Sequence, residues 1–397
     1  MRNRSAAPAY EPELYSRAAI QDPYPHYARL RELGPVVWLA KQRAYALPRY
    51  AECKAVLLDD ETFISGAGVA LNPVANQLSR GTTLNSDGED HSRRRALLAH
   101  RLTPRALRAM RATVDQQAVA AVEAAVSRGA IDGVELATAL PMSVVPDLIG
   151  WPQHGREHLL RWAGATFDSL GPINGQSVRT APAGAEMMRF TRRIARDRNL
   201  LPGSAGEEIL RAADEGTVKR SECPAMLIDY LAPSLDTTIG AISSALYLFA
   251  THPYQWQMLR ADPAKIPNAV NEVVRYESPL RAFSRKAARG TAVSGTTIPR
   301  GARVVVIYAS ANRDPREWKD PDTFDIRRDA SRQLGFGHGT HGCAGQGLAR
   351  LETQAVLRAL VDRVDRIDRI ELAGTGEWAI NNIIHRFEHL PLRLIPV

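Results

Sequence analysis

One short segment constrains this chain more than any other, because it places a single cysteine in a glycine-rich loop directly before a helix. The segment reads FGHGTHGCAG at residues 336–345, and a helical pattern of apolar residues runs from Gln346 to Leu360. Glycines at 337 and 339 let the backbone pass close to a flat group, where a Cβ would clash. The N–H groups and dipole at the helix start favour the thiolate of Cys343. The loop is therefore predicted to present a thiolate to a metal centre.

Haem and zinc are the two metal centres to compare. The pattern Phe-Gly-x-Gly-x-His-x-Cys-x-Gly arises by chance on the order of once in a million chains of this length. Structural zinc takes four ligands, but only His338 and His341 lie near Cys343, while Cys53 and Cys223 are remote. Haem is favoured over zinc and over a buried structural cysteine. A thiolate axial ligand favours O–O cleavage.

The loop resembles the cysteine loop of the bacterial cytochrome P-450 family, and separate motifs along nearly all 397 residues agree with it. The resemblance implies one domain over residues 1–397, mainly α with small β-sheets. Haem b, iron protoporphyrin IX, would lie between a central helix and the helix after the cysteine loop. The implied activity is an O2-dependent monooxygenase, an oxidoreductase that receives electrons from an acidic iron–sulfur ferredoxin and its NAD(P)H reductase.

Periodicity alone also predicts a mainly helical chain with few short strands. The expected helices cover 104–128, 155–170, 184–199, 223–251, 264–276 and 346–362. The expected strands are 36–40 with 44–48, 291–298, 304–307 and 390–395, with a turn at 296–301.

Composition limits the partners. The net charge of +8 is compatible with nucleic acid, but no nucleic-acid motif is present and aromatic residues make up only 6%. Three cysteines and an N-terminus without an apolar core predict a cytoplasmic protein with no membrane anchor. Arg93, Arg94, Arg105 and Arg108 form either a solvated basic face or a docking face for the ferredoxin.

The resemblance also assigns scaffold and haem-binding residues. Glu272 and Arg275, three apart on a helix, match a buried pair that joins an arginine of the segment 311–328 beneath the cysteine loop. His91 and Arg95 lie one helical turn apart, and with Arg285 and His341 they match the propionate-binding positions. Phe336 opens the cysteine loop and is expected beside the haem.

The central helix is expected to support oxygen activation. Asp236 and Thr237 match the family's acid–alcohol pair, so Asp236 would relay protons and Thr237 would hydrogen-bond dioxygen or its water. The alternative is a hydroxyl that bonds back to its own helix. Pro233 removes one N–H and crowds the carbonyl of Asp229, which is expected to open the helix.

The interior segments resemble most closely the branch that O-demethylates para-methoxybenzoate-type aromatics. Carried over, the substrate pocket would be lined by Leu84, Phe167, Leu170, Pro233, Leu280 and Phe283. That branch holds its carboxylate partly with an Arg-Ser pair, where this chain has Ile228 and Asp229, although Arg80 could supply one cation. A neutral methoxyphenol therefore becomes at least as good a candidate as a methoxybenzoate.

Other functions remain open at this point. A hydroxylase of a larger secondary metabolite, such as a terpenoid or polyketide, would use the same motifs. A peroxygenase is disfavoured by the intact Asp236–Thr237 pair. A haem carrier or sensor would need neither that pair nor a docking face.

Overall fold

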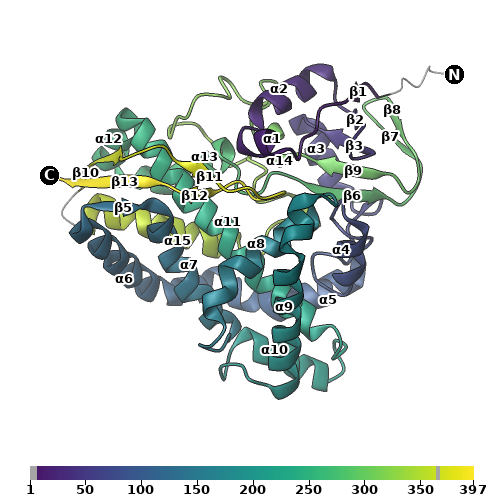
Figure 1. Cartoon of the computed structure of the whole chain (residues 1–397), viewed down its shortest axis with the longest axis horizontal. Helices are drawn as coiled ribbons and strands as arrows, with labels where there is room; N and C mark the ends of the chain where they lie inside the picture. The colour runs from purple at the N-terminus through teal and green to yellow at the C-terminus, as the bar shows by residue number, and fades with distance from the viewer. Residues whose placement is uncertain (1–6, 364–366) are drawn as a thin grey trace.

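The computed structural model describes residues 7–363 and 367–397. Its helices surround one long central helix, and its sheets lie at the edges of the helical part (Figure 1). The α-helices are α1 (Arg17–Gln21), α2 (Tyr24–Leu33), α3 (Tyr50–Leu58), α4 (Pro73–Leu78), α5 (Gly88–Ala99), α6 (Pro104–Arg128), α7 (Gly133–Ile149), α8 (Leu159–Leu170), α9 (Gly175–Asp197), α10 (Ala205–Asp214), α11 (Cys223–Thr251), α12 (Pro253–Ala261), α13 (Ile266–Tyr276), α14 (Tyr308–Ala311) and α15 (Gln346–Arg358).

The largest sheet joins distant parts of the chain. Its order is β1-β2-β3-β9-β6-β4, and β3 runs parallel to β9 with Tyr45 opposite Val304. A three-stranded sheet has the order β10-β13-β5, and two hairpins complete the β structure. The strands are β1 (Ala9–Tyr10), β2 (Val37–Leu39), β3 (Ala44–Leu47), β4 (Phe63–Ile64), β5 (Ala130–Asp132), β6 (Phe283–Ala287), β7 (Thr291–Val293), β8 (Thr296–Ile298), β9 (Arg303–Val306), β10 (Ile367–Leu372), β11 (Glu377–Trp378), β12 (Phe387–His389) and β13 (Pro391–Pro396).

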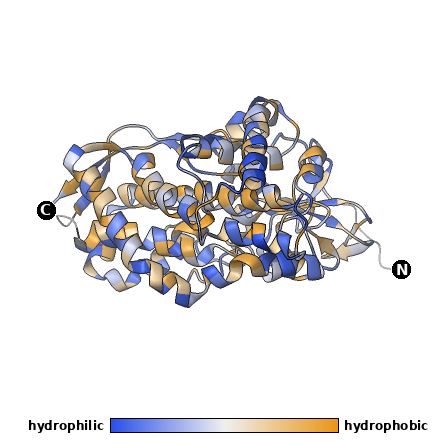
Figure 2. Cartoon of the chain, turned by 90° about the horizontal axis from the view of Figure 1, so that it is seen from below, coloured by the Kyte–Doolittle hydropathy of each residue, from blue (hydrophilic) through white to orange (hydrophobic). Residues whose placement is uncertain are grey.

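Local signals explain where several helices begin. Thr103 caps α6 by accepting the N–H of Ala106, with Pro104 at the first helical position, where its missing N–H costs nothing. Asn174 and Ser177 form a reciprocal capping box at the start of α9. Most helices in Figure 2 carry both hydrophilic and hydrophobic segments, as expected of helices with one buried face.

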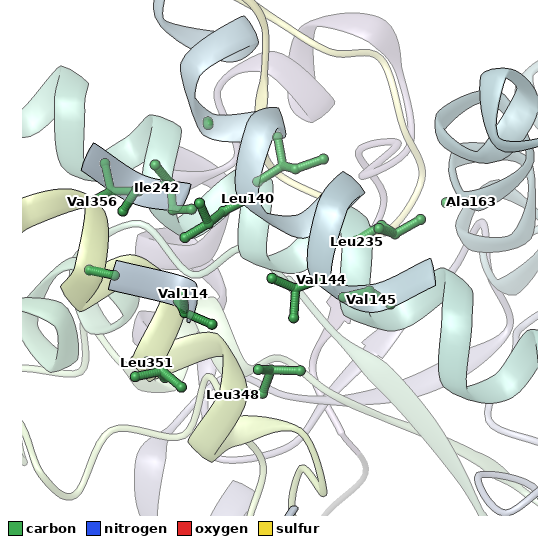
Figure 3. Close-up of a cluster of buried hydrophobic side chains, with 14 of the residues drawn as sticks. Val114, Leu140, Val144, Val145, Ala163, Leu235, Ile242, Leu348, Leu351 and Val356 are labelled. Carbon is green, nitrogen blue, oxygen red and sulfur yellow. The ribbon is translucent and has the colours of Figure 1, made fainter. Parts of the chain in front are cut away.

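The core is built around α11, which is buried along most of its length. Figure 3 shows Leu140 and Val144 of α7 and Leu348 and Leu351 of α15 within one cluster that also includes Leu235 of α11. Burial on this scale is the main source of stability. It holds α11 and the helix that follows the cysteine loop in fixed positions.

Two predictions about secondary structure are wrong. Residues 291–298 are not one strand but the hairpin β7–β8, because Ser294 and Gly295 both adopt positive φ, at 44° and 84°. The predicted turn at 296–301 is present only in its second half: β8 occupies 296–298, and the chain turns at 299–301, where the N–H of Ala302 donates to the carbonyl of Pro299 at 3.2 Å and Gly301 has φ of 85°. Pro233 does not open the central helix, which is continuous from Cys223 to Thr251. The predicted range 223–251 is confirmed, and no described helix is long and apolar enough to cross a membrane.

Candidate active site

A cavity of about 810 Å³ lies between α11 and the cysteine loop. Thr237 and Ala241 line it from α11, and Cys343 and Phe336 line it from the loop. The structure brings all the predicted substrate-pocket residues to its wall: Leu84, Phe167, Leu170, Pro233, Leu280 and Phe283. A concave, mostly apolar site with a few polar groups is typical of cofactor and substrate binding.

The cysteine loop closes on itself through its backbone. The N–H of Cys343 donates to the carbonyl of Phe336 at 2.8 Å, so the thiol is held at a fixed position. Gly337 and Gly339 both have φ of +69°, a left-handed conformation that favours glycine. A Cβ on Gly339 would lie 2.5 Å from the carbonyl oxygen of Leu57 in α3. The expectation that both glycines clear a flat cofactor is therefore wrong for Gly339, which instead clears α3.

The thiol of Cys343 faces the cavity. The N–H groups of Gly345 and Gln346 at the start of α15 lower its pKa, but burial has the larger effect and raises the pKa overall. The predicted effect of the helix start on the thiolate is therefore present, but it is smaller than the opposing effect of burial. A positive metal ion must supply the remaining stabilisation, since a coordinating thiol is deprotonated outright. Among the described residues no three His, Cys, Asp or Glu side chains are grouped as metal ligands.

Four basic side chains line the cavity: His91, Arg95, Arg285 and His341. The His91 and His341 rings have centroids 4.3 Å apart. Burial, with His341 and Arg95 nearby, lowers the pKa of His91 to about 4. Nδ1 of His91 and Nε2 of His341 are buried without a hydrogen-bond partner in the described chain. His341 Nε2 lies 3.5 Å from Asp87, too far for a good hydrogen bond.

These residues fit haem b. Two arginine cations and two histidine rings with unsatisfied nitrogens suit an added dianion, and the propionates of haem b are such a group. The thiol stands on one wall, and the small residue Ala241 and the apolar ring of Pro233 stand on the wall formed by α11. A flat ring between them would be contacted on both faces.

Thr237 and Asp236 occupy different environments. Thr237 lines the cavity, and its hydroxyl donates to the carbonyl of Pro233 at 2.6 Å, the bond to its own helix that the alternative interpretation described. Asp236 is 1% exposed and is not among the cavity-lining residues. Nε of Arg386 lies 3.3 Å from its Oδ1, and burial raises the pKa of Asp236 to about 6. Arg386 also contacts Glu388, which is half exposed, so this arginine connects Asp236 with the surface.

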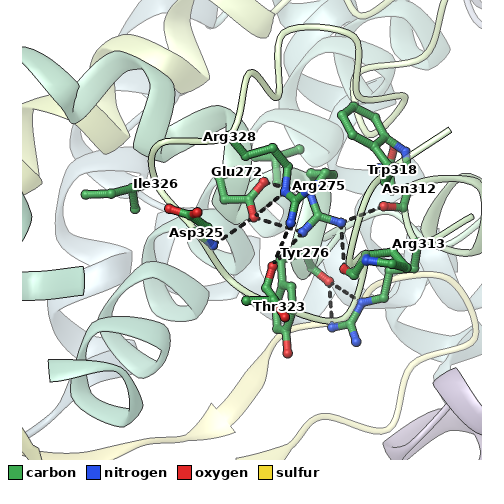
Figure 4. A network of polar contacts seen from close by, with 12 residues as sticks. Glu272, Arg275, Tyr276, Asn312, Arg313, Trp318, Thr323, Asp325, Ile326 and Arg328 are labelled. Atoms are coloured by element: carbon green, nitrogen blue, oxygen red, sulfur yellow. Dashed lines mark hydrogen bonds and ion pairs between the residues drawn. The ribbon is translucent and has the colours of Figure 1, made fainter. Parts of the chain in front are cut away.

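The predicted buried pair connects α13 with the segment 311–328 (Figure 4). Arg275 and Glu272 are both fully buried, with bonds of 2.6 and 2.8 Å. Arg275 also donates to the carbonyl of Asn312 at 2.8 Å, and Nε of Arg328 lies 3.3 Å from Glu272. Arg328 is therefore the arginine of the segment 311–328 that joins the pair. A buried pair with every charge satisfied avoids the several kcal/mol that an orphan charge costs.

Two arginines differ from their predicted positions. Arg94, assigned to the basic face, is buried and pairs with Glu222 at 2.8 Å, whereas Arg93, Arg105 and Arg108 are exposed. Arg80 is exposed and does not line the cavity.

Two residues of the site have no counterpart among the sequence predictions. Arg386 lies 150 positions beyond its partner Asp236, and no local pattern relates the two. Glu352, fully buried, lines the cavity from α15, and the helical period of α15 could have placed it on the inward face. Ile228 and Asp229, which the sequence placed at the carboxylate-binding positions of the resembled branch, both line the cavity from α11.

Comparisons with known proteins agree with this geometry. A family model described as cytochrome P450 matches residues 193–365. Cytochrome p450 CYP199A2 of Rhodopseudomonas palustris is 40% identical, over 94% of this chain and 92% of that protein. Cytochrome P450 monooxygenase PikC of Streptomyces venezuelae is 33% identical, over 94% and 91%. The structure of cytochrome P450 CREJ in complex with (4-ethylphenyl) dihydrogen phosphate has a TM-score of 0.86 at 25% identity, covering 94% of this chain and 98% of that one. This protein therefore belongs to the cytochrome P450 family of haem b monooxygenases.

Proposed function

We propose that this protein oxidises a small methoxylated aromatic substrate at its methoxy carbon, releasing formaldehyde and leaving a phenol. One observation carries the proposal: a single cavity has Cys343 on one wall, Thr237 opposite, and the aromatic side chains Phe167 and Phe283 around the space between. Haem must occupy part of its 810 Å³, so the remainder suits one substituted ring better than a macrolide. Rings near Phe167 and Phe283 gain from edge-to-face contact.

The chain's own residues take distinct roles in this proposal. Cys343 would hold the haem iron through its thiolate, and the haem would supply oxygen activation when bound. His91, Arg95, Arg285 and His341 would hold its propionates. Thr237 can turn its hydroxyl from the Pro233 carbonyl toward a bound molecule, because both lie at the cavity wall. Asp236, with a pKa of about 6, can release and take up a proton near neutral pH, and Arg386 links it to the surface.

Electrons are proposed to come from an acidic ferredoxin docking beside the cysteine loop. Arg105 and Arg108 are exposed on α6 and flank Leu107. A Cβ on Gly347, four residues after Cys343, would lie 2.6 Å from Leu107, so this part of α6 packs against the start of α15. The basic face is therefore close to the thiolate.

All three cysteines are free, which supports a cytoplasmic location.

The ligand assignment is tested by the spectrum of the reduced protein with carbon monoxide. A thiolate ligand should give the red-shifted Soret band, and Cys343→His should keep haem but lose that band. Cys223→Ala, at a buried cysteine outside the cavity, should keep it. A normal band in the Cys343 variant would contradict the assignment.

The reaction is tested by formaldehyde release from methoxyarenes with ferredoxin, reductant and O2. Product with hydrogen peroxide alone, at a comparable rate, would favour a peroxygenase. Tight haem without turnover of any compound would favour a carrier or sensor. A larger metabolite is the second candidate substrate, since 6-deoxyerythronolide B hydroxylase of Saccharopolyspora erythraea is a relative at 30% identity. It would gain support if no methoxyarene binds.

A further inference from the structure

Asp229 on α11 uses its two carboxylate oxygens differently. Oδ2 accepts the backbone N–H of Thr83 at 2.8 Å and that of Leu84 at 3.2 Å. Every hydrogen bond found for this carboxylate within residues 7–363 and 367–397 ends on Oδ2, and Asp229 lines the cavity. Oδ1 is thus an acceptor without a protein donor at the cavity wall. An ionised carboxylate only accepts hydrogen bonds, and a secluded acceptor is stabilised when a donor reaches it.

No ion pair holds this carboxylate directly. In the described chain no Arg, Lys or His nitrogen comes within ion-pair distance of Asp229. The charge of Arg94 acts on it only from further away, because Arg94 pairs with Glu222 at 2.8 Å. Burial raises the pKa of Asp229 to about 6, against the smaller opposing effects of the Leu84 and Thr83 N–H groups, the Thr83 side chain and Arg94. The carboxylate is therefore ionised at neutral pH and repels another anion from this part of the cavity.

Neighbouring contacts hold the segment 82–86 against α11, so the carboxylate cannot easily turn away. Tyr230 donates its hydroxyl to the carbonyl of Arg94 at 2.9 Å. The hydroxyl oxygens of Thr83 and Tyr230 lie 2.8 Å apart and share a further hydrogen bond. The loop is also closed internally, because the N–H of Asn85 donates to the Thr82 hydroxyl at 3.1 Å. Asp229 and Tyr230 together fix the cavity wall that carries Leu84.

The position of Asp229 along α11 determines how long a substrate must be to contact both Asp229 and Thr237. Asp229, Pro233 and Thr237 follow at intervals of four residues and all line the cavity. Asp229 and Thr237 are therefore about 12 Å apart along the helix axis. One substituted benzene ring with a hydrogen bond at each end has a comparable length. A substrate contacting both ends carries its hydrogen-bond donor opposite its methoxy group.

We propose that Asp229 determines specificity: Oδ2 anchors the loop, and Oδ1 accepts the hydroxyl hydrogen of a neutral para-methoxyphenol. This inference rests on the proposed demethylation and names its substrate class. A methoxybenzoate is disfavoured because its carboxylate meets Oδ1 without a donor or cation between them.

The test uses Asp229→Asn in the haem-loaded protein. Both N–H groups end on one oxygen, so the amide oxygen of Asn can accept them in place of Oδ2. Its NH2 group then takes the place of Oδ1, so an acceptor becomes a donor while the loop stays anchored. Asp214→Asn, at the exposed end of α10 and outside the cavity, is the matched control and should bind as the wild type does.

The probes are 4-methoxyphenol, 4-methoxybenzoate and 1,4-dimethoxybenzene, titrated by calorimetry and by the Soret shift. We expect the wild type to bind the phenol about tenfold more tightly than either other compound, since a hydrogen bond to a charged group is worth roughly that or more. In Asp229→Asn the order of phenol and benzoate should reverse. The dimethoxy compound, which has no donor, should change less than threefold.

Three results overturn the inference. The first is that Asp229→Asn keeps its haem spectrum and still binds the phenol more tightly than the benzoate. Another is equal binding of the phenol and 1,4-dimethoxybenzene by the wild type, which needs no variant. In that case formaldehyde release from either compound would leave the proposed function intact. If no probe binds or is demethylated, the proposed function fails and this inference fails with it.

Discussion

Glu352 offers a direct test of how the cavity is built. Its side chain is fully buried on α15, and neither carboxylate oxygen has a hydrogen-bond partner among the described residues. Burial raises the pKa of Glu352 from 4.5 to about 8. The carboxyl group is therefore neutral in the folded protein at pH 7 and ionised in the unfolded chain. In the wild type the free energy of unfolding should therefore fall as pH rises. We predict that Glu352→Gln removes this fall, because glutamine does not titrate.

The sign and size follow from linkage. A carboxyl with a raised folded pKa binds more protons in the folded state, so its contribution is complete below pH 4.5 and is lost as pH rises to about 8. At about 1.36 kcal/mol per pH unit, the loss is about 3 kcal/mol by pH 7 and about 5 kcal/mol above pH 8. These are upper values, because the folded protein can relax around a buried charge. The glutamine variant should match the wild type near pH 4.5 and be several kcal/mol more stable at pH 9.

Urea unfolding of both haem-loaded proteins, followed by circular dichroism from pH 5 to pH 9, measures this difference. Other titrating groups are shared, so they largely cancel between the two curves. Glu89→Gln, at an exposed position on α5, is the control and should give a constant difference from the wild type. A constant difference for Glu352→Gln as well would refute the reasoning, because it would mean that the buried carboxyl is ionised at no extra cost.

Three further predictions follow from the site. Arg275→Met should cost about 3–5 kcal/mol in urea unfolding, because it leaves Glu272 charged and buried. Thr237→Ala should consume reductant but release hydrogen peroxide in place of product. Full coupling of reductant to formaldehyde would exclude a role for its hydroxyl. Reversing Arg105 and Arg108 to Glu should slow reduction by ferredoxin, and added salt should slow the wild type similarly. Reduction rates that ignore both charge and salt would mean that this face is only solvated.

Sequence patterns were informative where one segment carries its own signal. The range of α11 follows from a helical pattern of apolar residues that continues over 29 residues. The cysteine loop follows from a motif whose residues are close together in the sequence. Sequence patterns do not predict contacts between segments that are far apart in the chain. The bond from Leu84 to Asp229 spans 145 residues, and neither residue shows it alone. Helix α7 was not predicted, because Pro141 and Pro146 interrupt its helical sequence pattern. Packing against the surrounding core keeps the segment helical.

The pairing of β3 with β9 has a consequence for how the chain reaches its folded state. Tyr45 and Val304 meet across about 260 residues, so β3 has no partner on that edge until most of the chain has left the ribosome. Closing so long a loop is entropically costly, and contacts of this kind slow folding. Helices α6 to α11 are consecutive in the chain and can pack on one another earlier (Figure 1). The strand edge of β3 is therefore exposed during synthesis, and a chain stalled before residue 303 should aggregate through that edge rather than through its helices.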